Sequence, residues 1–525
     1  MKFLLLLALA VVLVYPNTDL HRYQQQITAD TLSARLDFFA SDFFEGRETG
    51  ARGQKLAAHY LVSEYRQLGL SPSFQSFTVY RRTPKQTRLE VTIDNRRVAS
   101  STFSAEHHDD LSFFYTGGFA EASGGVVFGG SVGEKVDYNG KWLMILEDES
   151  TPFINQRSAI MKGKPKGVLI VSDDGKFAER AAQASLDAKR LGGLSLVESS
   201  DFPPTFAIST KLADQLLAPS KQTIANLKKQ KPAVFELDKS VKVTAAVERS
   251  APLTTENVVA LIEGVDPKLK QEVLVISSHY DHLGINPALK GDQIFNGAAD
   301  DGSGVVASLE LARLFVKAKQ DGHGPRRSIL FIHFSGEEKG LLGSTYYSQR
   351  PIIPWERTVA DINMDGVAGV DAKHPTQSKN YIYILGHEEL STELVDLNKR
   401  LNQETGVNLE LTPNQGFGSD HYNFEVQFIP YLYYSTGLTE KYHQPGDEPN
   451  TIDYEHFARV VRLIFATAWQ VANQDVRVRG VDRSRLSLDG YTCRPCPFAC
   501  DDTVYNQPGE CPVCGMALAP RYKRS

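Results

Sequence analysis

Short apolar segments alternate with helical segments between residues 256 and 475, and this alternation is the strongest constraint on the fold. We predict strands at residues 273–276, 329–332, 381–385 and 429–434. We predict a helix at residues 303–318, because their apolar side chains recur at the spacing of one helix face. Apolar strands that alternate with helices are typical of a mostly parallel sheet with helices on both faces. The predicted fold class is therefore α/β.

In the first part of the chain, from residue 31 to 120, we predict helices followed by short strands. Residues 31–70 show helical spacing around a turn-rich segment at 43–50, and Gly69 is expected to end the helix. The side chains that we expect on its buried face are Leu56, Tyr60, Leu61, Tyr65 and Leu68. Residues 75–120 alternate weakly between apolar and polar, which indicates short strands.

The middle of the chain, from about 120 to 240, has a different character. Its apolar runs are short and are separated by glycine, proline and charged residues. We predict buried strands at residues 126–128, 142–146, 168–171 and 205–208. This stretch therefore predicts a small β-rich unit, and its sequence contains no constellation of catalytic side chains.

Histidine, aspartate and glutamate residues follow the strands of the alternating region. These residues are His279, Asp300, Glu338, Asp365 and His443. The carboxyl ends of parallel strands lie at one edge of a sheet, and ligands bind there. We therefore expect the five side chains to form one site.

The donor atoms of these side chains are nitrogen and oxygen, which suit zinc. Three carboxylates against two divalent ions leave a charge of about +1, which a bound hydroxide would neutralise. Glu337, next to Glu338, could take the proton from the attacking water and pass it to the leaving amine. Asp281, two residues after His279, could accept the second ring N–H and fix the tautomer.

Each of these motifs has an ordinary structural explanation when it is taken alone. A His-x-Asp pair is usually a surface pair, Glu337-Glu338 a solvated loop, and Asp300-Asp301-Gly302 a helix cap or turn. The prediction rests on their joint order. We interpret Asp301 as a helix cap or a residue that orients the ligands. His333 is expected in the core, and His282 and His421 either line the pocket or lie beside it.

The segments SHYDHLG, NGAADDGSG, FSGEEKGLLGS, NMDG and YHQPGDE, in this order, resemble the co-catalytic zinc aminopeptidases of the bacterial leucyl-aminopeptidase type. The resemblance covers residues 30–118 and 245–475 and implies a zinc exopeptidase fold. It implies that Asp300 bridges two Zn²⁺ ions, that Glu338 and His443 complete one site, and that His279 and Asp365 complete the other. Glu337 matches the general base, and Asp281 matches the partner of His279.

The expected activity is hydrolysis of N-terminal residues from peptides by a hydroxide that bridges the metals, with Glu337 as general base. Two other activities on the same fold stay open, namely a carboxypeptidase of the glutamate type and a glutaminyl cyclase. A non-catalytic metal-handling or binding protein is a further alternative. An adhesion or receptor role is disfavoured, because such relatives have lost metal ligands and this chain has all five.

The β-rich insert resembles a protease-associated domain in its layout, with a passive structural insert as the alternative. The predicted organisation is a signal peptide (1–17), a first peptidase segment (28–118), the insert (119–244), a second peptidase segment (245–475), a linker (476–488) and a cysteine-rich ribbon (489–520).

All five cysteines lie in the last part of the chain, at positions 493, 496, 500, 511 and 514. Cys493 with Cys496 and Cys511 with Cys514 form two C-x-x-C pairs, a spacing that suits a tetrahedral zinc site. The tail also resembles a heavy-metal-binding ribbon with the pattern YTC…GxCPxCGM, although Cys496 stands where that pattern commonly has histidine. The alternative is two disulfides and one free cysteine, because an oxidising compartment favours disulfides.

The N-terminus predicts export. Lys2 precedes an apolar run at residues 3–14, which is typical of a secretory signal peptide and too short for a transmembrane helix of about 20 residues. We expect a periplasmic or extracellular protein without a membrane span after signal removal, with an uncleaved anchor as the alternative. The net charge of −6 argues against a nucleic-acid partner. The expected partners are peptide substrates.

Overall fold

The structure is a computed structural model of the whole chain. It describes residues 18–81, 86–103, 110–115, 121–130, 138–146, 160, 163–173, 175–179, 193–198, 203–229, 234–248, 251–413, 418–481, 485–493, 503–509, 511 and 518–524. The predicted signal peptide at 1–17 lies outside these residues. Within the described parts of the chain, no helix is both long and apolar enough to cross a membrane.

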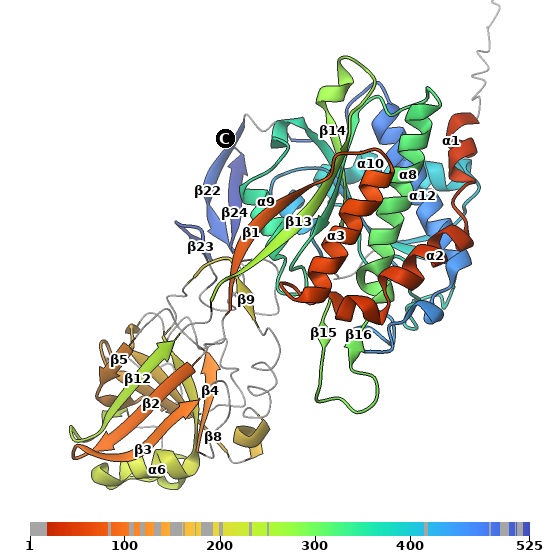
Figure 1. Cartoon of the computed structure of the whole chain (residues 1–525). Coiled ribbons are helices and arrows are strands. Elements are labelled where there is room, and N and C mark those ends of the chain that lie inside the picture. The colour runs from red at the N-terminus through yellow and green to blue at the C-terminus, as the bar shows by residue number, and fades with distance from the viewer. Residues whose placement is uncertain are drawn as a thin grey trace, which may run out of the picture.

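A nine-stranded sheet forms the centre of the larger body in Figure 1. Its strands, in spatial order, are β20 (Glu410–Pro413), β19 (Tyr381–Leu385), β21 (Tyr431–Ser435), β18 (Thr358–Met364), β14 (Val273–His279), β17 (Ser328–Phe334), β13 (Leu253–Ile262), β1 (Ser73–Arg81) and β9 (Leu194–Ser195). The central strands β21, β18, β14 and β17 run parallel. Antiparallel pairings add β19 on one side and β13, β1 and β9 on the other. The predicted parallel arrangement thus holds for the strands that precede the candidate ligands, and the complete sheet is mixed.

Helices cover both faces of this sheet, because the central strands are apolar on both sides. Leu274 and Ile276 of β14 pack in one core with helices α2 (Ala29–Phe39), α3 (Arg52–Gln67), α8 (Ser303–Gln320) and α12 (Tyr454–Asn473). Val273 and Val275 point to the opposite core, which includes Tyr347 of α9 (Leu342–Gln349). The alternation of side chains along a strand explains this division.

The N-terminal helices form as predicted, with one difference in the buried face. Helix α3 ends at Gln67, and Gly69 follows with a φ of +79°. Leu61 and Tyr65 are buried, whereas Leu56 is 38% exposed. The small side chains of Ala57 and Ala58 occupy the buried face instead, which brings the helix close to its neighbours.

The β-rich unit is a second body with its own core (Figure 1). One sheet contains β11 (Phe235–Glu236), β6 (Val126–Phe128), β7 (Trp142–Leu146), β8 (Gly167–Ser172), β10 (Thr205–Ser209) and β4 (Leu111–Tyr115). The other contains β3 (Arg96–Phe103), β2 (Gln86–Ile93), β12 (Lys242–Glu248) and β5 (Glu121–Gly124). The four strands predicted in this unit are present. Its predicted start at residue 119 is corrected, because β2, β3 and β4 pair within its sheets and place the start near residue 86.

The tail contains a three-stranded sheet of β22 (Leu486–Thr492), β23 (Val504–Tyr505) and β24 (Ala519–Arg524). Cys493 directly follows β22, Cys511 lies a few residues after β23, and both are buried. Cys496, Cys500 and Cys514 lie outside the described residues. The sheet thus holds one cysteine of each predicted pair in its interior.

Candidate active site

The candidate ligands come from loops at one edge of the central sheet. His279 is the last residue of β14, and Asp365 directly follows β18. Glu338 lies in the turn after β17, Asp300 in the turn before α8, and His443 in the loop after β21. Parallel strands place their carboxyl ends together, so sheet topology brings these loops to one place.

Asp300 lies at the centre of the cluster, and its two carboxylate oxygens face different partners. Oδ1 is 3.2 Å from His279 Nε2, and Oδ2 is 3.2 Å from His443 Nε2. His279 Nε2 is also 3.5 Å from Asp365 Oδ1, and His443 Nε2 is 3.2 Å from Glu338 Oε2. The structure therefore brings all five side chains together, in two groups that share Asp300.

This geometry fits a pair of metal ions. Two ligands of one tetrahedral zinc, each bound at about 2.0–2.2 Å, lie about 3.3–3.5 Å apart, which is close to the measured separations. The buried His279 Nε2 has no hydrogen-bond partner among the described residues. A buried polar atom without a partner is costly, and a cation between the two groups would remove this cost.

The orientation of His279 is set by a backbone group rather than by the predicted side chain. Its Nδ1 lies 3.1 Å from the carbonyl oxygen of Asp281. A carbonyl oxygen only accepts hydrogen bonds, so Nδ1 carries the proton and Nε2 presents its lone pair to Asp300 and Asp365. The Asp281 carboxylate lies 3.9 Å from Nδ1. The predicted hydrogen bond between the two side chains is therefore absent.

The Asp281 carboxylate instead holds the loop that carries the candidate base. One oxygen accepts a hydrogen bond from Thr49 Oγ1 at 2.6 Å, and the other accepts one from the backbone N–H of Glu337 at 3.1 Å. Asp281 therefore orients Glu337 and links it to the N-terminal segment.

Asp301 orients the loops around the cluster. Its carboxylate accepts hydrogen bonds from the backbone N–H groups of His279, Gly304 and Gly366, at 3.1, 2.9 and 3.1 Å. These donors belong to three separate segments of the site. Both carboxylate oxygens are thus used by the backbone, in agreement with the interpretation of Asp301 as a residue that positions the ligands.

Asp447 has a similar role that the sequence analysis missed. Its carboxylate accepts hydrogen bonds from the backbone N–H groups of Ala299 and Asp300, at 2.9 and 3.1 Å. It therefore fixes the turn that presents Asp300. Its only sequence signal is its place in the YHQPGDE segment, because the contact joins two loops that are distant in the chain.

Arg47 is a fully buried cation beneath the site, and the sequence analysis placed it only in a turn-rich segment. Its guanidinium donates hydrogen bonds to the carbonyl oxygens of Tyr280, Asn296 and Gly297, at 2.9, 2.6 and 2.9 Å. A further hydrogen bond of 3.3 Å reaches Phe39 O. Burial lowers the pKa of Arg47 to about 10, against the attraction of nearby carboxylates such as Asp447. Arg47 therefore clamps the loops on both sides of the cluster.

We expect Arg47→Met to lower the free energy of unfolding of the metal-free protein by about 3 kcal/mol or more, because it leaves buried carbonyl groups without donors. Urea denaturation followed by circular dichroism measures this loss. Arg52→Met is the matched control, because Arg52 is largely exposed and its ion pair with Glu45 lies at the surface. Equal stability of Arg47→Met and the unmodified protein would contradict the clamp.

The cluster is strongly acidic, and this shifts the pKa values of its members. Burial lowers the pKa of His443, but Asp300 and Glu338 outweigh it and raise that pKa to about 10. Burial raises the pKa of the Glu337 carboxyl well above its usual value, and Asp365 and Glu338 raise it further. The site thus attracts positive charge, and Glu337 has the raised proton affinity of a general base.

A pocket of about 280 Å³ opens beside the cluster. Its walls include four carboxylate residues, Asp300, Glu337, Asp365 and Asp447. The remaining wall residues are mainly glycine, Tyr433, Leu438 and Tyr442, and no lysine or arginine is among the described lining residues. The pocket is slightly smaller than the roughly 300–1,000 Å³ of sites for drug-sized ligands, and its carboxylates would attract a positively charged group.

The other histidines lie around this pocket in different roles. His333 is buried in β17 and contacts Ser278 and Tyr65, as expected for a core residue. His421 does not line the pocket, because it stacks on Tyr433, a wall residue, with ring centroids 4.4 Å apart. His282 is fully buried, with Nδ1 2.7 Å from Glu338 Oε1.

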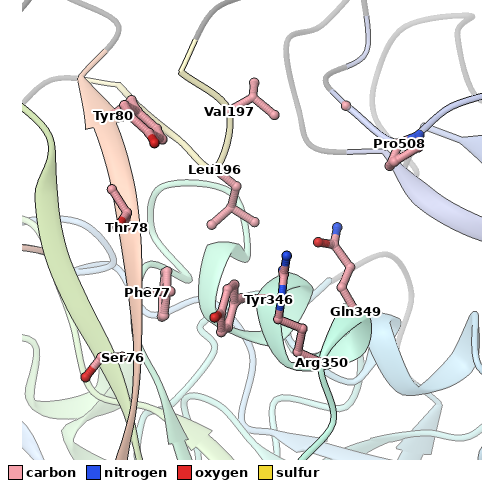
Figure 2. Close-up of a pocket in the computed structure, with 11 residues that line it drawn as sticks. Ser76, Phe77, Thr78, Tyr80, Leu196, Val197, Tyr346, Gln349, Arg350 and Pro508 are labelled. Carbon is pink, nitrogen blue, oxygen red and sulfur yellow. The ribbon is translucent and has the colours of Figure 1, made fainter.

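A larger pocket of about 460 Å³ lies between β1, α9, residues 196–197 and residues 508–509 of the tail (Figure 2). Phe77 and Tyr346 stack in its wall with ring centroids 4.9 Å apart, and the Arg350 guanidinium lies 4.9 Å from the Tyr346 ring. No histidine or carboxylate is among its described lining residues. The candidate metal ligands therefore open to the smaller pocket and not to this one.

Comparison with known proteins gives two family matches. Residues 257–468 match peptidase family M28, and residues 495–521 match the heavy metal binding domain. The first match contains all five candidate ligands. No curated protein sequence matches the chain.

Solved structures share the fold. An aminopeptidase from Aneurinibacillus sp. strain AM-1 is similar with a TM-score of 0.55 and 21% identity, over 88% of this chain and 98% of that chain. BSAP, a zinc aminopeptidase from Bacillus subtilis, is similar with a TM-score of 0.52 and 18% identity, over 86% of this chain and 96% of that chain. Both comparisons extend over most of this chain and nearly all of the other protein.

Proposed function

Since residues 257–468 are a peptidase family M28 domain, we propose that this protein is a zinc-dependent aminopeptidase that removes N-terminal residues from peptides. The observation that carries the proposal is the pair of ligand groups around Asp300. Asp300, Glu338 and His443 would hold one Zn²⁺, and Asp300, His279 and Asp365 the other. The similarity to two aminopeptidases, one of them described as a zinc enzyme, supports this assignment.

Bound zinc would polarise the scissile carbonyl and lower the pKa of the attacking water. Glu337, which lines the pocket, takes a proton from that water and transfers it to the leaving amine. Asp281 keeps the Glu337 backbone in place through its 3.1 Å hydrogen bond. The protein thus contributes a positioned base and an acidic pocket.

The acidic wall favours an aminopeptidase over a carboxypeptidase. A free N-terminal ammonium group is attracted to Asp300, Glu337 and Asp365. A C-terminal carboxylate would need a cationic partner, and the described lining residues include none. The apolar and aromatic wall residues then contact the side chain of the N-terminal residue.

The decisive experiment compares leucine and alanine p-nitroanilides with a dipeptide that has a C-terminal glutamate. We expect release of p-nitroaniline that stops with a chelator and returns with Zn²⁺, and no cleavage of the same dipeptide carrying an acetylated N-terminus. Cleavage of the acetylated dipeptide would instead support a carboxypeptidase. Cyclisation of an N-terminal glutamine peptide without hydrolysis would support a cyclase.

The other parts of the chain have proposed roles of their own. The β-rich unit resembles a protease-associated domain in layout, and we assign it to shaping access for peptides. The tail would bind one further metal ion through Cys493, Cys496, Cys511 and Cys514, consistent with the match to the heavy metal binding domain. The N-terminal segment would direct export.

The tail assignment predicts a third ion. We expect about three zinc ions per chain in protein purified under reducing conditions, and about two in the double variant Cys493→Ser/Cys511→Ser, because thiolates are the ligands of such ribbons. Elemental mass spectrometry measures both values, and peptidase activity should stay unchanged as the control. About two ions in both proteins would show that the tail binds no metal ion.

A further inference from the structure

Glu338 has two different neighbours, one for each carboxylate oxygen. Oε2 is 3.2 Å from His443 Nε2, as expected for two ligands of one metal ion. Oε1 is 2.7 Å from His282 Nδ1. This separation is that of an ion pair in direct contact, and it is shorter than the about 3.3–3.5 Å expected between two ligands of one tetrahedral zinc. His282 therefore contacts the carboxylate oxygen that is turned away from His443.

The imidazole of His282 is held firmly in this position. Its backbone N–H donates a 3.1 Å hydrogen bond to Arg47 O, and the side chain is fully buried. The ring packs against Gly297, where an added Cβ would lie 2.6 Å from His282 Cδ2. Gly297 also has a φ of +57°, which favours glycine. Neither ring nitrogen has a hydrogen-bond partner among the described residues, and the closest carboxylate oxygen to Nδ1 is Glu338 Oε1 at 2.7 Å.

We propose that His282 is a positioning residue that orients Glu338 for metal binding and thereby supports one half of the site. This inference rests on the proposed two-zinc function. His282 contacts the ligand group of Glu338, His443 and Asp300 through Glu338. The nearest Asp300 oxygen is farther from His282 Nδ1, at 3.9 Å. Removal of His282 should therefore lower the affinity for the zinc ion at Glu338 and His443. The affinity for the ion at His279 and Asp365 should stay the same.

The test is a competition titration of Zn²⁺ against a coloured chelator, which resolves the two dissociation constants of the active site beside that of the tail. We expect His282→Phe to lower the zinc affinity of one position about 10–100-fold, as is usual when a partner of a metal ligand is removed. The affinity of the other position should change little. We expect His282→Asn to recover most of that affinity, because its side-chain N–H can lie near the position of Nδ1. Melting of the metal-free variants confirms that they fold.

His333→Asn is the matched control, because His333 is equally buried but contacts Ser278 and Tyr65 rather than a candidate ligand. It should keep both zinc affinities. The inference would be overturned if His282→Phe kept both zinc affinities, or if it lowered both equally. It would also be overturned if the Phe and Asn variants lost the same affinity, because His282 would then be a ligand. Failure of the unmodified protein to bind two ions would instead reject the proposed function.

Discussion

Glu337→Gln is expected to lower kcat by about 10²–10⁴-fold, because the amide cannot accept the proton of the attacking water, and to leave both active-site zinc ions bound. Glu337 lies in the wall of the acidic pocket, and the close contacts that define the two ligand groups around Asp300 do not involve it. The amide has the size of the carboxyl group, so the surrounding packing should persist. Steady-state kinetics and elemental analysis of the same preparation measure both properties.

The neighbouring residue provides the matched control. Glu338→Gln changes the same functional group one position along the chain, but Glu338 belongs to the ligand group with His443. We expect this variant to lose one zinc ion together with its activity. Activity near that of the unmodified enzyme in Glu337→Gln, or loss of zinc equal to that of Glu338→Gln, would show that Glu337 is not the base.

Asp300→Asn is expected to empty both metal positions of the active site, which lowers the zinc content by about two ions per chain and leaves only the tail ion, and to reduce activity to background. The reason is geometric, because the two oxygens of Asp300 face His279 and His443 separately. An amide has one oxygen and one N–H₂ group, so it cannot serve two cations. Equilibrium dialysis with Zn²⁺ measures the remaining sites.

Single-site variants separate this effect from general damage to the loops. Asp365→Asn affects only the group that contains His279, so one of the two active-site ions should remain. Thermal melting without metal should show that Asp300→Asn is folded, since its backbone N–H still bonds to Asp447. Retention of one active-site ion in Asp300→Asn, beside the tail ion, would show that Asp300 serves one position and does not bridge the pair.

The sequence predicted the central fold and the candidate ligands because both are written in local patterns. Apolar runs of strand length and a helical period around 303–318 identify the elements, and these correspond to β14, α8 and β17. The order of the elements then predicts that residues directly after parallel strands meet at one edge. His279 and Asp365 meet in this way, with 3.5 Å between Nε2 and Oδ1.

Only the tertiary structure decided which groups support these ligands. The Asp281 carbonyl, rather than its carboxylate, fixes His279, and Arg47, Asp447 and His282 reach the site across loops that are distant in sequence. The start of the β-rich unit near residue 86 could not be predicted from the sequence either, because β2 belongs to this unit through its pairing with the distant strand β12. A side chain's residue type determines what it can donate or accept, whereas its partner depends on loop conformations that arise from long-range packing.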